Sequence, residues 1–444
     1  MKPPPDIAYL SPEFPGQTHS FIWRELEVLR AHGLHVRLLS TKRPPAGIRS
    51  HAWTGEAMNS TAFLNRPSAR DALGAAGVAL RAGPRRWVRA LRTLRSGVAE
   101  SRASHKDSVS KLWATLPMGL MLAARARREG WRHLHVHSAA KAAMVAAVAS
   151  MLSPVTYSVI LHGFLHTYGP HQGIKFGNAL FGMVITDAIL QDLRRAIGDV
   201  EADLVVAPMG VDLERFTRAT EYPTWSPDQP LRLFSCGRFI HGKGHGDLIG
   251  ACLQMLDDGV PLQLTIAGED AAEGAGYRRE QQVRVDATPH AAAFRFLGAV
   301  NEDAICKELD AAHAFVLMSH EEGLGVSIME AMAYEVPVVA SDAGGIRELI
   351  THDVEGLLAT PQDPAAIRAA LERVMAESGE GGAIDRWRQA ARKKVERDYT
   401  SARSAGVLMD ALVRHGVLDA SRIGRPEVTA AESRRALPPA AEDA

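Results

Sequence analysis

The sequence is poor in cysteine. Its 444 residues include three cysteines, Cys236, Cys252 and Cys306, and none of them forms a C-x-x-C pair. An odd and scattered set supplies neither a disulfide framework nor a cysteine-based metal site. The cysteine content therefore favours a protein of a reducing compartment.

The sequence also lacks an apolar run long enough to cross a bilayer. The longest one, residues 112–124, is interrupted by Thr115 and Pro117, and it is shorter than the roughly 20 residues that a spanning helix needs. The N-terminal segment MKPPPDIAYL has prolines where a signal peptide needs an apolar centre. We expect a cytoplasmic protein that can still bind the cytoplasmic membrane face as a peripheral protein.

The sequence has no overall excess of charge. Basic and acidic side chains number 51 each, so the formal net charge at pH 7 is +0, and no global positive field indicates a nucleic-acid partner. The distribution is uneven, however, because residues 1–225 hold 28 basic and 17 acidic side chains whereas residues 226–444 hold 23 and 34. This asymmetry predicts two lobes with different partners.

Residues 81–132 are strongly basic, with 13 basic and 3 acidic side chains. Within them, RRWVRALRTLRSG places Trp87, Val88, Leu91 and Leu94 on one face of a helix, with arginines around it. A basic amphipathic helix of this kind can rest on anionic lipid. The alternative is a solvated helix that packs against its own lobe, and the sequence leaves both open.

Short apolar segments with strand character alternate with helical segments along the chain. They are residues 7–10, 35–40, 133–138, 156–161, 183–186 and 204–208, and then residues 231–237, 262–268, 294–298, 314–319 and 336–342. Apolar strands separated by helices are typical of a parallel sheet covered on both faces. The alternation restarts after the proline-rich segment EYPTWSPDQP, which predicts two doubly wound α/β lobes in tandem. No repeat is present, so a solenoid is excluded.

A glycine-rich stretch, SCGRFIHGKGHG, follows the first strand of the second lobe. It places Arg238 and Lys243 five residues apart, across a turn that leads into a helix near His245. Two cations beside the free amides of a helix start suit a diphosphate. Neither a Walker loop nor a dinucleotide fingerprint is present. The alternative is an exposed glycine-rich turn with two unrelated cations.

A second stretch, AFVLMSHEEGLGVSIMEAMA, reads as strand, turn and helix. Glu322 falls at the carboxyl end of the strand, Gly323 and Gly325 let the backbone approach a ligand, and Glu330 lies in the helix. Carboxylates for hydroxyl groups and cations for a diphosphate together predict a nucleotide-sugar site. Alternatively, Glu330 is a buried carboxylate that pairs with another part of the protein.

These motifs identify a resemblance to the family 4 retaining glycosyltransferases of the GT-B fold, over about residues 7–416. It is carried by CGRFIHGKG, LTIAGED, FLGAV, APMGVDLERF and the pair Glu322 and Glu330, with seven residues between them, within EEGLGVSIMEAMAYEVPVVASDAGGIREL. The resemblance implies two Rossmann-like domains that face a cleft, over residues 1–207 and 208–388, with helices over 389–420 that cross back to the first domain. Residues 421–444 are expected to be a disordered tail.

The resemblance also implies roles for single residues. Arg238 and Lys243 would hold the donor diphosphate, Glu330 the ribose, and the edge near Val300 the base. Glu322 would contact the transferred sugar and act in catalysis, helped by the amides of Leu324, Gly325 and Val326.

In the first lobe, SPEFPGQTHSFIWRE resembles the opening of bacterial exopolysaccharide transferases of the colanic-acid type. The resemblance implies that Gly16, Gln17 and Thr18 lie over the cleft on the acceptor side. Thr18 is also expected to cap the first helix. His162, just past a strand, would reach the donor sugar as a catalytic residue, whereas we expect structural roles for His133 and His135. Many relatives have an acidic residue where this chain has Leu165.

The expected reaction moves a hexosyl unit from a nucleoside diphosphate sugar to a hydroxyl acceptor, such as a lipid-linked glycan, with retention at the anomeric carbon. It would serve the synthesis of exopolysaccharide or another surface glycan, without a metal or cofactor. The alternatives are a catalytically silent subunit that binds the donor, and a nucleotide-sugar epimerase on the same fold. A phosphorylase is less well supported because no lysine site for its cofactor can be located.

Overall fold

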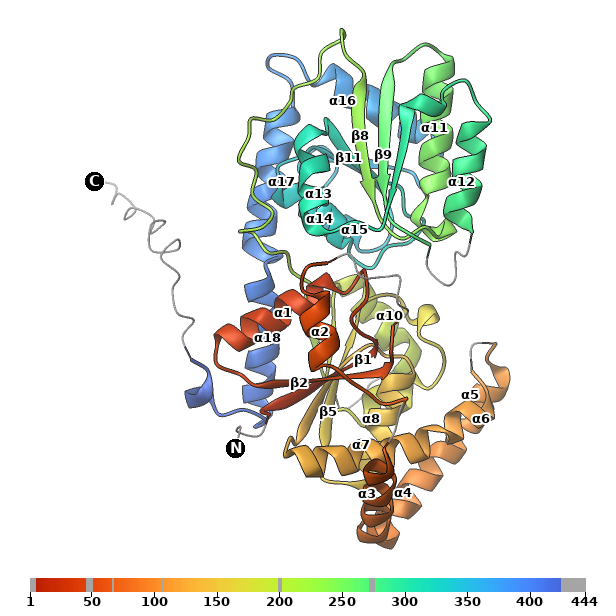
Figure 1. Cartoon of the computed structure of the whole chain (residues 1–444), viewed down its shortest axis with the longest axis vertical. Coiled ribbons are helices and arrows are strands. Elements are labelled where there is room, and N and C mark those ends of the chain that lie inside the picture. The colour runs from red at the N-terminus through yellow and green to blue at the C-terminus, as the bar shows by residue number, and fades with distance from the viewer. Residues whose placement is uncertain are drawn as a thin grey trace, which may run out of the picture.

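The computed structural model describes residues 5–44, 51–65, 68–105, 107–198, 202–270 and 276–424. Within these ranges the chain forms two α/β lobes, one above the other in Figure 1. This confirms the architecture that the alternation of strands and helices predicts. Most of the expected tail, residues 425–444, lies outside the described residues.

The first lobe is built on a parallel sheet of seven strands in the order β3-β2-β1-β4-β5-β6-β7. The strands are β1 (Ile7–Glu13), β2 (Val36–Lys42), β3 (Ala62–Phe63), β4 (His133–His137), β5 (Thr156–Leu161), β6 (Phe181–Val184) and β7 (Asp203–Val206). The central strands are buried over nearly their whole length, which explains their continuous apolar sequences.

Helices cover both faces of this sheet, and a group of them projects from the end remote from the second lobe (Figure 1). They are α1 (Ser20–Ala31), α2 (Thr54–Ser60), α3 (Ala69–Arg81), α4 (Gly83–Ser96), α5 (Val98–Ala103), α6 (Val109–Trp113), α7 (Thr115–Glu129), α8 (Lys141–Leu152), α9 (Gln172–Gly177) and α10 (Asp187–Ile197). No helix of the described residues is long and apolar enough to span a membrane.

The second lobe has a parallel sheet of six strands in the order β10-β9-β8-β11-β12-β13. The strands are β8 (Leu231–Cys236), β9 (Leu262–Ala267), β10 (Phe294–Gly298), β11 (Ala314–Leu317), β12 (Val338–Ser341) and β13 (Leu357–Ala359). Its helices are α11 (His245–Asp257), α12 (Tyr277–Asp286), α13 (Glu302–Ala311), α14 (Val326–Ala333), α15 (Ile346–Leu349) and α16 (Pro364–Ala376).

The chain then returns to the first lobe, as expected. Helix α17 (Ile384–Asp398) lies along the second lobe, where it packs on α14, and α18 (Ser401–Arg414) packs on α1 of the first lobe (Figure 1). Between the two helices, Thr400 forms a parallel bridge with Val211 in the segment that joins the lobes. The two segments by which the chain passes between the lobes are therefore bonded to each other.

Several local expectations are wrong in detail. The strand expected at residues 183–186 occupies Phe181–Val184, and the short edge strands β3 and β13 have no counterpart in the prediction. Helix α1 begins at Ser20 with His19 at its N-cap, and no side chain of the described residues caps it, so Thr18 is not the cap. Helix α4 buries Ala90 and Leu94, whereas Val88 stays 46% exposed.

Candidate functional site

A cavity of about 400 Å³ lies between the two lobes. Its walls come from segments that follow strands β1, β4 and β5 of the first lobe and strands β8, β10 and β11 of the second. Because the carboxyl ends of parallel strands meet at one edge of each sheet, the two edges face each other across the cavity, where α/β sheets bind ligands.

The cations of the second lobe enter this cavity from the turn after β8. Lys243 ends a short 3-10 helix, His241–Lys243, and Gly244 then adopts a left-handed conformation with φ of +65° before α11 begins. Arg238 is exposed and forms no ion pair within the described part of the chain. Lys243 forms an ion pair with Glu322. One cation is thus free, and the other is held by a carboxylate.

Glu322 is fixed by the turn that follows β11. Ser319 donates a hydrogen bond from Oγ to Glu322 Oε2 at 3.2 Å, and the amide of Gly345 donates to the Glu322 carbonyl at 2.9 Å. Gly325, with φ of +91°, then leads into α14, whose start has no side-chain cap among the described residues. Uncapped amides at a helix start are suited to an anionic or hydroxyl-bearing ligand.

Glu330 takes part in an ion network that joins the lobes. Arg24 Nη2 on α1 donates to Glu330 Oε1 and to Glu302 Oε1, both at 2.7 Å, and Arg215 Nε lies 3.2 Å from Glu302 Oε2. The Glu330 side chain is 7% exposed. Burial raises the pKa of its carboxyl group, and the charge of Arg24 opposes that shift. No described hydrogen bond uses the second oxygen, Oε2, of Glu330.

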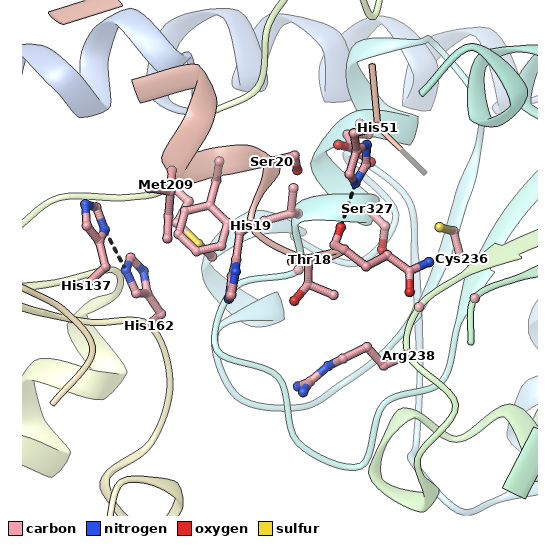
Figure 2. A pocket seen from close by; sticks show the side chains of 18 of the residues that line it. Thr18, His19, Ser20, His51, His137, His162, Met209, Cys236, Arg238 and Ser327 are labelled. Carbon is pink, nitrogen blue, oxygen red and sulfur yellow. Dashed lines mark hydrogen bonds between the residues drawn. The ribbon is translucent and has the colours of Figure 1, made fainter. Parts of the chain in front are cut away.

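The first lobe contributes histidines to the opposite wall. His162 Nε2 lies 3.4 Å from His137 Nδ1, and the His162 ring contacts the Phe21 ring in a tilted arrangement, with centroids 4.7 Å apart. Figure 2 shows His19 between this pair and Arg238. Burial lowers the pKa of His162 to about 3, with further lowering by the neighbouring His135 and His19. Its imidazole is therefore neutral at pH 7.

Known proteins resemble this chain in sequence and in fold. Residues 223–394 match the family model of glycosyl transferases group 1. The match covers most of the second lobe, which therefore resembles a group 1 glycosyl transferase domain.

Curated relatives of this chain include the amylovoran biosynthesis glycosyltransferase AmsK of Erwinia amylovora, 32% identical over 210 residues that make up 46% of this chain and 49% of AmsK. They also include glycogen synthase of Mycobacterium tuberculosis, 29% identical over 208 residues, 47% of this chain and 48% of the synthase. The chain thus spans about half the length of the curated relatives it matches.

Solved structures resemble both lobes together. Sucrose-phosphate synthase from Thermosynechococcus elongatus gives a TM-score of 0.67 at 20% identity over 92% of this chain and 98% of that structure. Anabaena HepE in complex with UDP and glucose gives a TM-score of 0.68 at 16% identity over 92% and 99%. These likenesses show that the chain has the GT-B fold, with the second lobe as its second half.

The cavity brings together most of the residues that the sequence singles out. These are Gln17, Thr18 and His162 of the first lobe, and Arg238, Lys243, Val300, Glu322, Gly325, Val326 and Glu330 of the second lobe. Gly16 and Leu324 do not line the cavity, and the Leu324 side chain is buried at 1% exposure. The role expected for the Leu324 amide stays a prediction.

Sequence reasoning missed several residues of the cavity and its walls. Glu302, His19 and His51 line the cavity, and His51 Nε2 lies 2.7 Å from the Gln17 carbonyl oxygen (Figure 2). Arg24 lies behind the wall, where it pairs with Glu302 and Glu330. A signal for Arg24 existed, because a charged residue inside the buried stripe of an amphipathic helix needs a partner. That partner lies in the other lobe, and no local pattern points to it.

Proposed function

We propose that the protein is a retaining glycosyltransferase of the hexosyl type, acting in the synthesis of exopolysaccharide or another surface glycan. One observation carries the proposal: Arg238, Lys243, Glu322 and Glu330 meet on one interlobe cavity, opposite His162 and Thr18. The group 1 match and the exopolysaccharide relative AmsK support it.

In the proposed complex, the donor diphosphate lies between Arg238 and Lys243. Lys243 exchanges its bond with Glu322 for bonds to the phosphates, and the released carboxylate accepts hydroxyl groups of the sugar. Glu330 keeps Arg24 on Oε1 and offers Oε2 to the ribose hydroxyls. The base lies near Val300. The arrangement gives each of Arg238, Lys243, Glu322 and Glu330 a polar partner on the donor, and Glu330 keeps its ion pair with Arg24.

In the transfer step, the bond between the anomeric carbon and the diphosphate oxygen breaks, and a bond to the acceptor oxygen forms on the same face of the sugar. The acceptor proton passes to the leaving diphosphate, so no side chain needs to act as a nucleophile. Arg238, Lys243 and the uncapped amides of α14 stabilise the negative charge that grows on the leaving group. The neutral His162 can hydrogen-bond a sugar hydroxyl. We propose no metal or cofactor for this step.

The donor site can be tested by a thermal-shift screen with UDP-, GDP- and ADP-sugars, because a ligand of the folded state raises Tm. We expect one of them to raise Tm in the parent and to have no effect on Lys243→Ala. Glu330→Gln, which keeps an acceptor for Arg24, should weaken the shift strongly. Lys394→Ala is the matched control, since Lys394 pairs with Glu355 at 3.4 Å, outside the cavity wall. Unchanged shifts in the site variants would reject the site.

Turnover separates the alternatives. A donor that binds but is never consumed with any hydroxyl acceptor would favour a silent donor-binding subunit. Conversion of the donor to its epimer in the absence of acceptor would favour an epimerase. Release of nucleoside diphosphate with formation of an α-linked product from an α-linked donor would support the retaining transferase.

We further propose that the acceptor is lipid-linked and that the first lobe binds a membrane through an α3–α4 surface. This surface comprises Leu73, Leu80 and Val88, which are 75%, 86% and 46% exposed, and the exposed residues Arg85, Arg86, Arg89 and Arg92. It holds three of the five large hydrophobic side chains that are exposed among the described residues. Apolar tips surrounded by arginines suit an anionic lipid surface.

Flotation with phosphatidylglycerol vesicles tests this surface. Replacing Arg85, Arg86 and Arg92 by glutamate, or Leu80 by serine, should abolish binding. Replacing Arg194 and Arg195, exposed on α10 of the same lobe, by glutamate should not. Equal loss in both sets would mean that binding depends only on net charge and would remove the proposal.

A further inference from the structure

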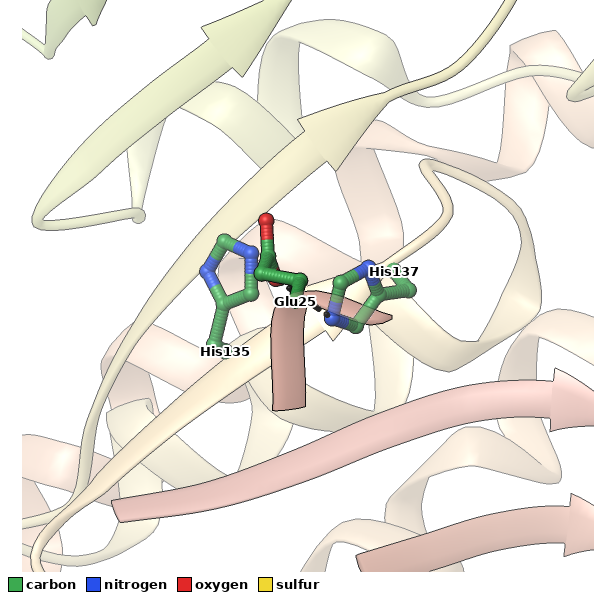
Figure 3. Close-up of side chains that lie close together, drawn as sticks. All are labelled: Glu25, His135 and His137. Carbon is green, nitrogen blue, oxygen red and sulfur yellow. Dashed lines mark ion pairs between the residues drawn. The ribbon is translucent and has the colours of Figure 1, made fainter. Parts of the chain in front are cut away.

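Three buried side chains of the first lobe converge beside the cavity, whose wall includes one of them, His137. Glu25 comes from α1, and His135 and His137 come from β4 (Figure 3). One potential ligand atom of each lies within 4.8 Å of the other two, and all three residues are buried. Nothing in the proposed transfer reaction uses this cluster.

The strand and its neighbours explain the convergence. Successive side chains of a strand alternate between the two faces of a sheet, so His135 and His137 project from the same face. Strand β4 lies beside β1, where Tyr9 is in register with His135, and Tyr9 donates a hydrogen bond to Glu25 Oε1 at 2.7 Å. Helix α1 therefore lays its one buried glutamate directly over the two histidines.

Each histidine of the cluster has one nitrogen bonded and one nitrogen without a partner. His135 Nδ1 lies 2.8 Å from Ser158 Oγ, and His137 Nδ1 lies 3.4 Å from His162 Nε2. The Nε2 atoms of both are buried and unpartnered among the described residues. His133, on the same face, differs because both its nitrogens are bonded, to Thr156 and Ser158 at 2.9 Å. These two buried Nε2 atoms therefore lack a partner for their lone pairs, which could be a metal ion or a hydrogen-bond donor.

Glu25 is the third member of the cluster, and no lysine or arginine lies beside its carboxylate in the described ranges. Its carboxylate accepts hydrogen bonds from Tyr9 and, at 3.1 Å, from Ser404 Oγ on α18. His137 Nε2 lies 3.7 Å from Oε1, too far for a hydrogen bond, and no lysine or arginine of the described ranges pairs with Glu25. A cation in the cluster would neutralise a charge that the protein otherwise leaves uncompensated.

We propose that Glu25, His135 and His137 bind a divalent transition-metal ion, with Zn²⁺ the best match. Two neutral imidazoles and one carboxylate form a known zinc donor set, and a water molecule would complete the tetrahedron. The ligand atoms must close to about 3.3 Å from one another, as bonds of about 2.0–2.1 Å to a tetrahedral ion require. The bonds of Ser158 and His162 to the distal ring nitrogens would orient the ligands.

The site would hold together three elements that are far apart in the chain. Glu25 anchors α1, the two histidines anchor β4, and the bond from Ser404 extends the contact to α18. The ion would therefore be structural, and its loss would loosen the helices over the sheet. The sequence predicts no cysteine-based metal site and no metal in the transfer step. Neither expectation concerns a structural ion held by histidines and a carboxylate.

Metal content of the purified full-length protein tests the proposal. After growth with zinc and dialysis, mass spectrometry of the metals should find about one zinc ion per chain, as a closed buried site retains its ion. Glu25→Gln and His135→Asn should lose it, and His133→Asn, the matched buried control on the same strand, should keep it. Cobalt substitution of the parent should give the visible absorption bands of tetrahedral Co²⁺.

A second measurement covers variants that fail to fold. Removing the metal from the parent with a chelator at neutral pH should lower Tm, and added Zn²⁺ should restore it. Parent protein with no zinc above background and no change in Tm with Zn²⁺ would overturn the proposal in favour of a buried water molecule. Zinc retained by Glu25→Gln and His135→Asn would overturn it too. Donor binding is a separate readout, so protein that binds donor without zinc would leave the proposed function intact.

Discussion

Arg24 is the residue on which the contact between the lobes is centred. It comes from α1 of the first lobe and is 4% exposed, and it meets two carboxylates, Glu302 and Glu330, that belong to the second. Its guanidinium also lies over the Phe216 ring, 5.1 Å from the centroid. Removal of this shared cation would leave the buried Glu330 unpaired and would leave Glu302 with Arg215 alone.

Arg24→Met should therefore be strongly destabilising. We expect the free energy of unfolding to fall by about 3–5 kcal/mol, the cost of breaking a buried ion pair, as measured by urea denaturation at pH 7. Arg30→Met on the same helix is the control. Arg30 pairs with Glu56 at the surface, where the side chains are 35% and 62% exposed, and we expect a loss below about 1 kcal/mol. Similar losses in the two variants would contradict the interpretation of the network.

His313 gives the fold a dependence on pH. Its Nδ1 accepts a hydrogen bond from the Arg232 amide at 3.0 Å, and burial, followed by the charge of Arg232, lowers its pKa to about 4. The unfolded chain takes up this proton near pH 6.5 and the folded chain does not, so this contribution to stability is lost as pH falls from about 6.5 to 4.

His313→Asn keeps an acceptor for the Arg232 amide but cannot be protonated. Between pH 7 and pH 5, the parent should lose up to about 2 kcal/mol more stability than the variant, since each pH unit is worth about 1.4 kcal/mol for one proton. Urea denaturation at several pH values measures both curves. Parallel curves would show that His313 titrates normally in the folded state.

At the scale of elements, the turn between β8 and α11 depends on Gly244. A Cβ atom at this position would lie 1.8 Å from the Met318 carbonyl oxygen, and the residue has φ of +65°. The turn that carries Lys243 can approach the end of β11 only because no side chain stands there.

Gly244→Ala should lose more than about 2 kcal/mol of stability, from left-handed strain and the clash together, and should also lose donor binding. Gly242→Ala, two residues earlier, is the control, because an added Cβ meets nothing within 4 Å there. Its stability should change by less than about 0.5 kcal/mol. Denaturation and nucleotide titration of both variants provide the measurements, and an unaffected Gly244→Ala would contradict the packing described.

The elements that the sequence predicts best are those with a strong local pattern. Residues 156–161 and 294–298 match strands β5 and β10, and α11 begins at His245 as expected. Strands β3 and β13 are too short, at 2 and 3 residues, to give a periodic signal. The start of α1 was misplaced because the helix lacks the side-chain cap on which the expectation rested.

The residues of the site likewise divide into those that a local pattern predicts and those that it does not. Motifs that are local in the sequence, such as Arg238 with Lys243 and Glu322 with Glu330, could be found from their spacing. The pairing of Arg24 with Glu302 and Glu330 spans 278 and 306 residues and depends on how the lobes meet. The cluster of Glu25, His135 and His137 likewise depends on α1 covering β4, which no spacing reveals.

At the scale of the whole molecule, the lobes touch closely beside the cavity. A Cβ atom on Gly323 of the second lobe would lie 2.8 Å from the His162 carbonyl oxygen and 3.2 Å from Ile185 Cδ1 of the first. The absence of a side chain at this position sets how far the lobes can close.

Gly323→Ala should hold the lobes slightly apart. We expect a larger radius of gyration by X-ray scattering with donor bound, and turnover lowered roughly tenfold to a hundredfold by misplacement of the two halves of the site. Gly406→Ala on α18, where nothing lies within 4 Å of the added Cβ, should leave both unchanged. Full turnover in Gly323→Ala would show that this contact does not limit closure.

The path of α18 has a consequence for how the protein is made. Domains usually fold in the order in which the ribosome releases them, but the helix that covers α1 follows the whole second lobe in the chain. The N-terminal lobe must therefore wait, with one helix face uncovered, until the whole C-terminal lobe has been translated. Premature termination near residue 400 would leave the beginning of the protein unfinished, and the two lobes reach their final form together.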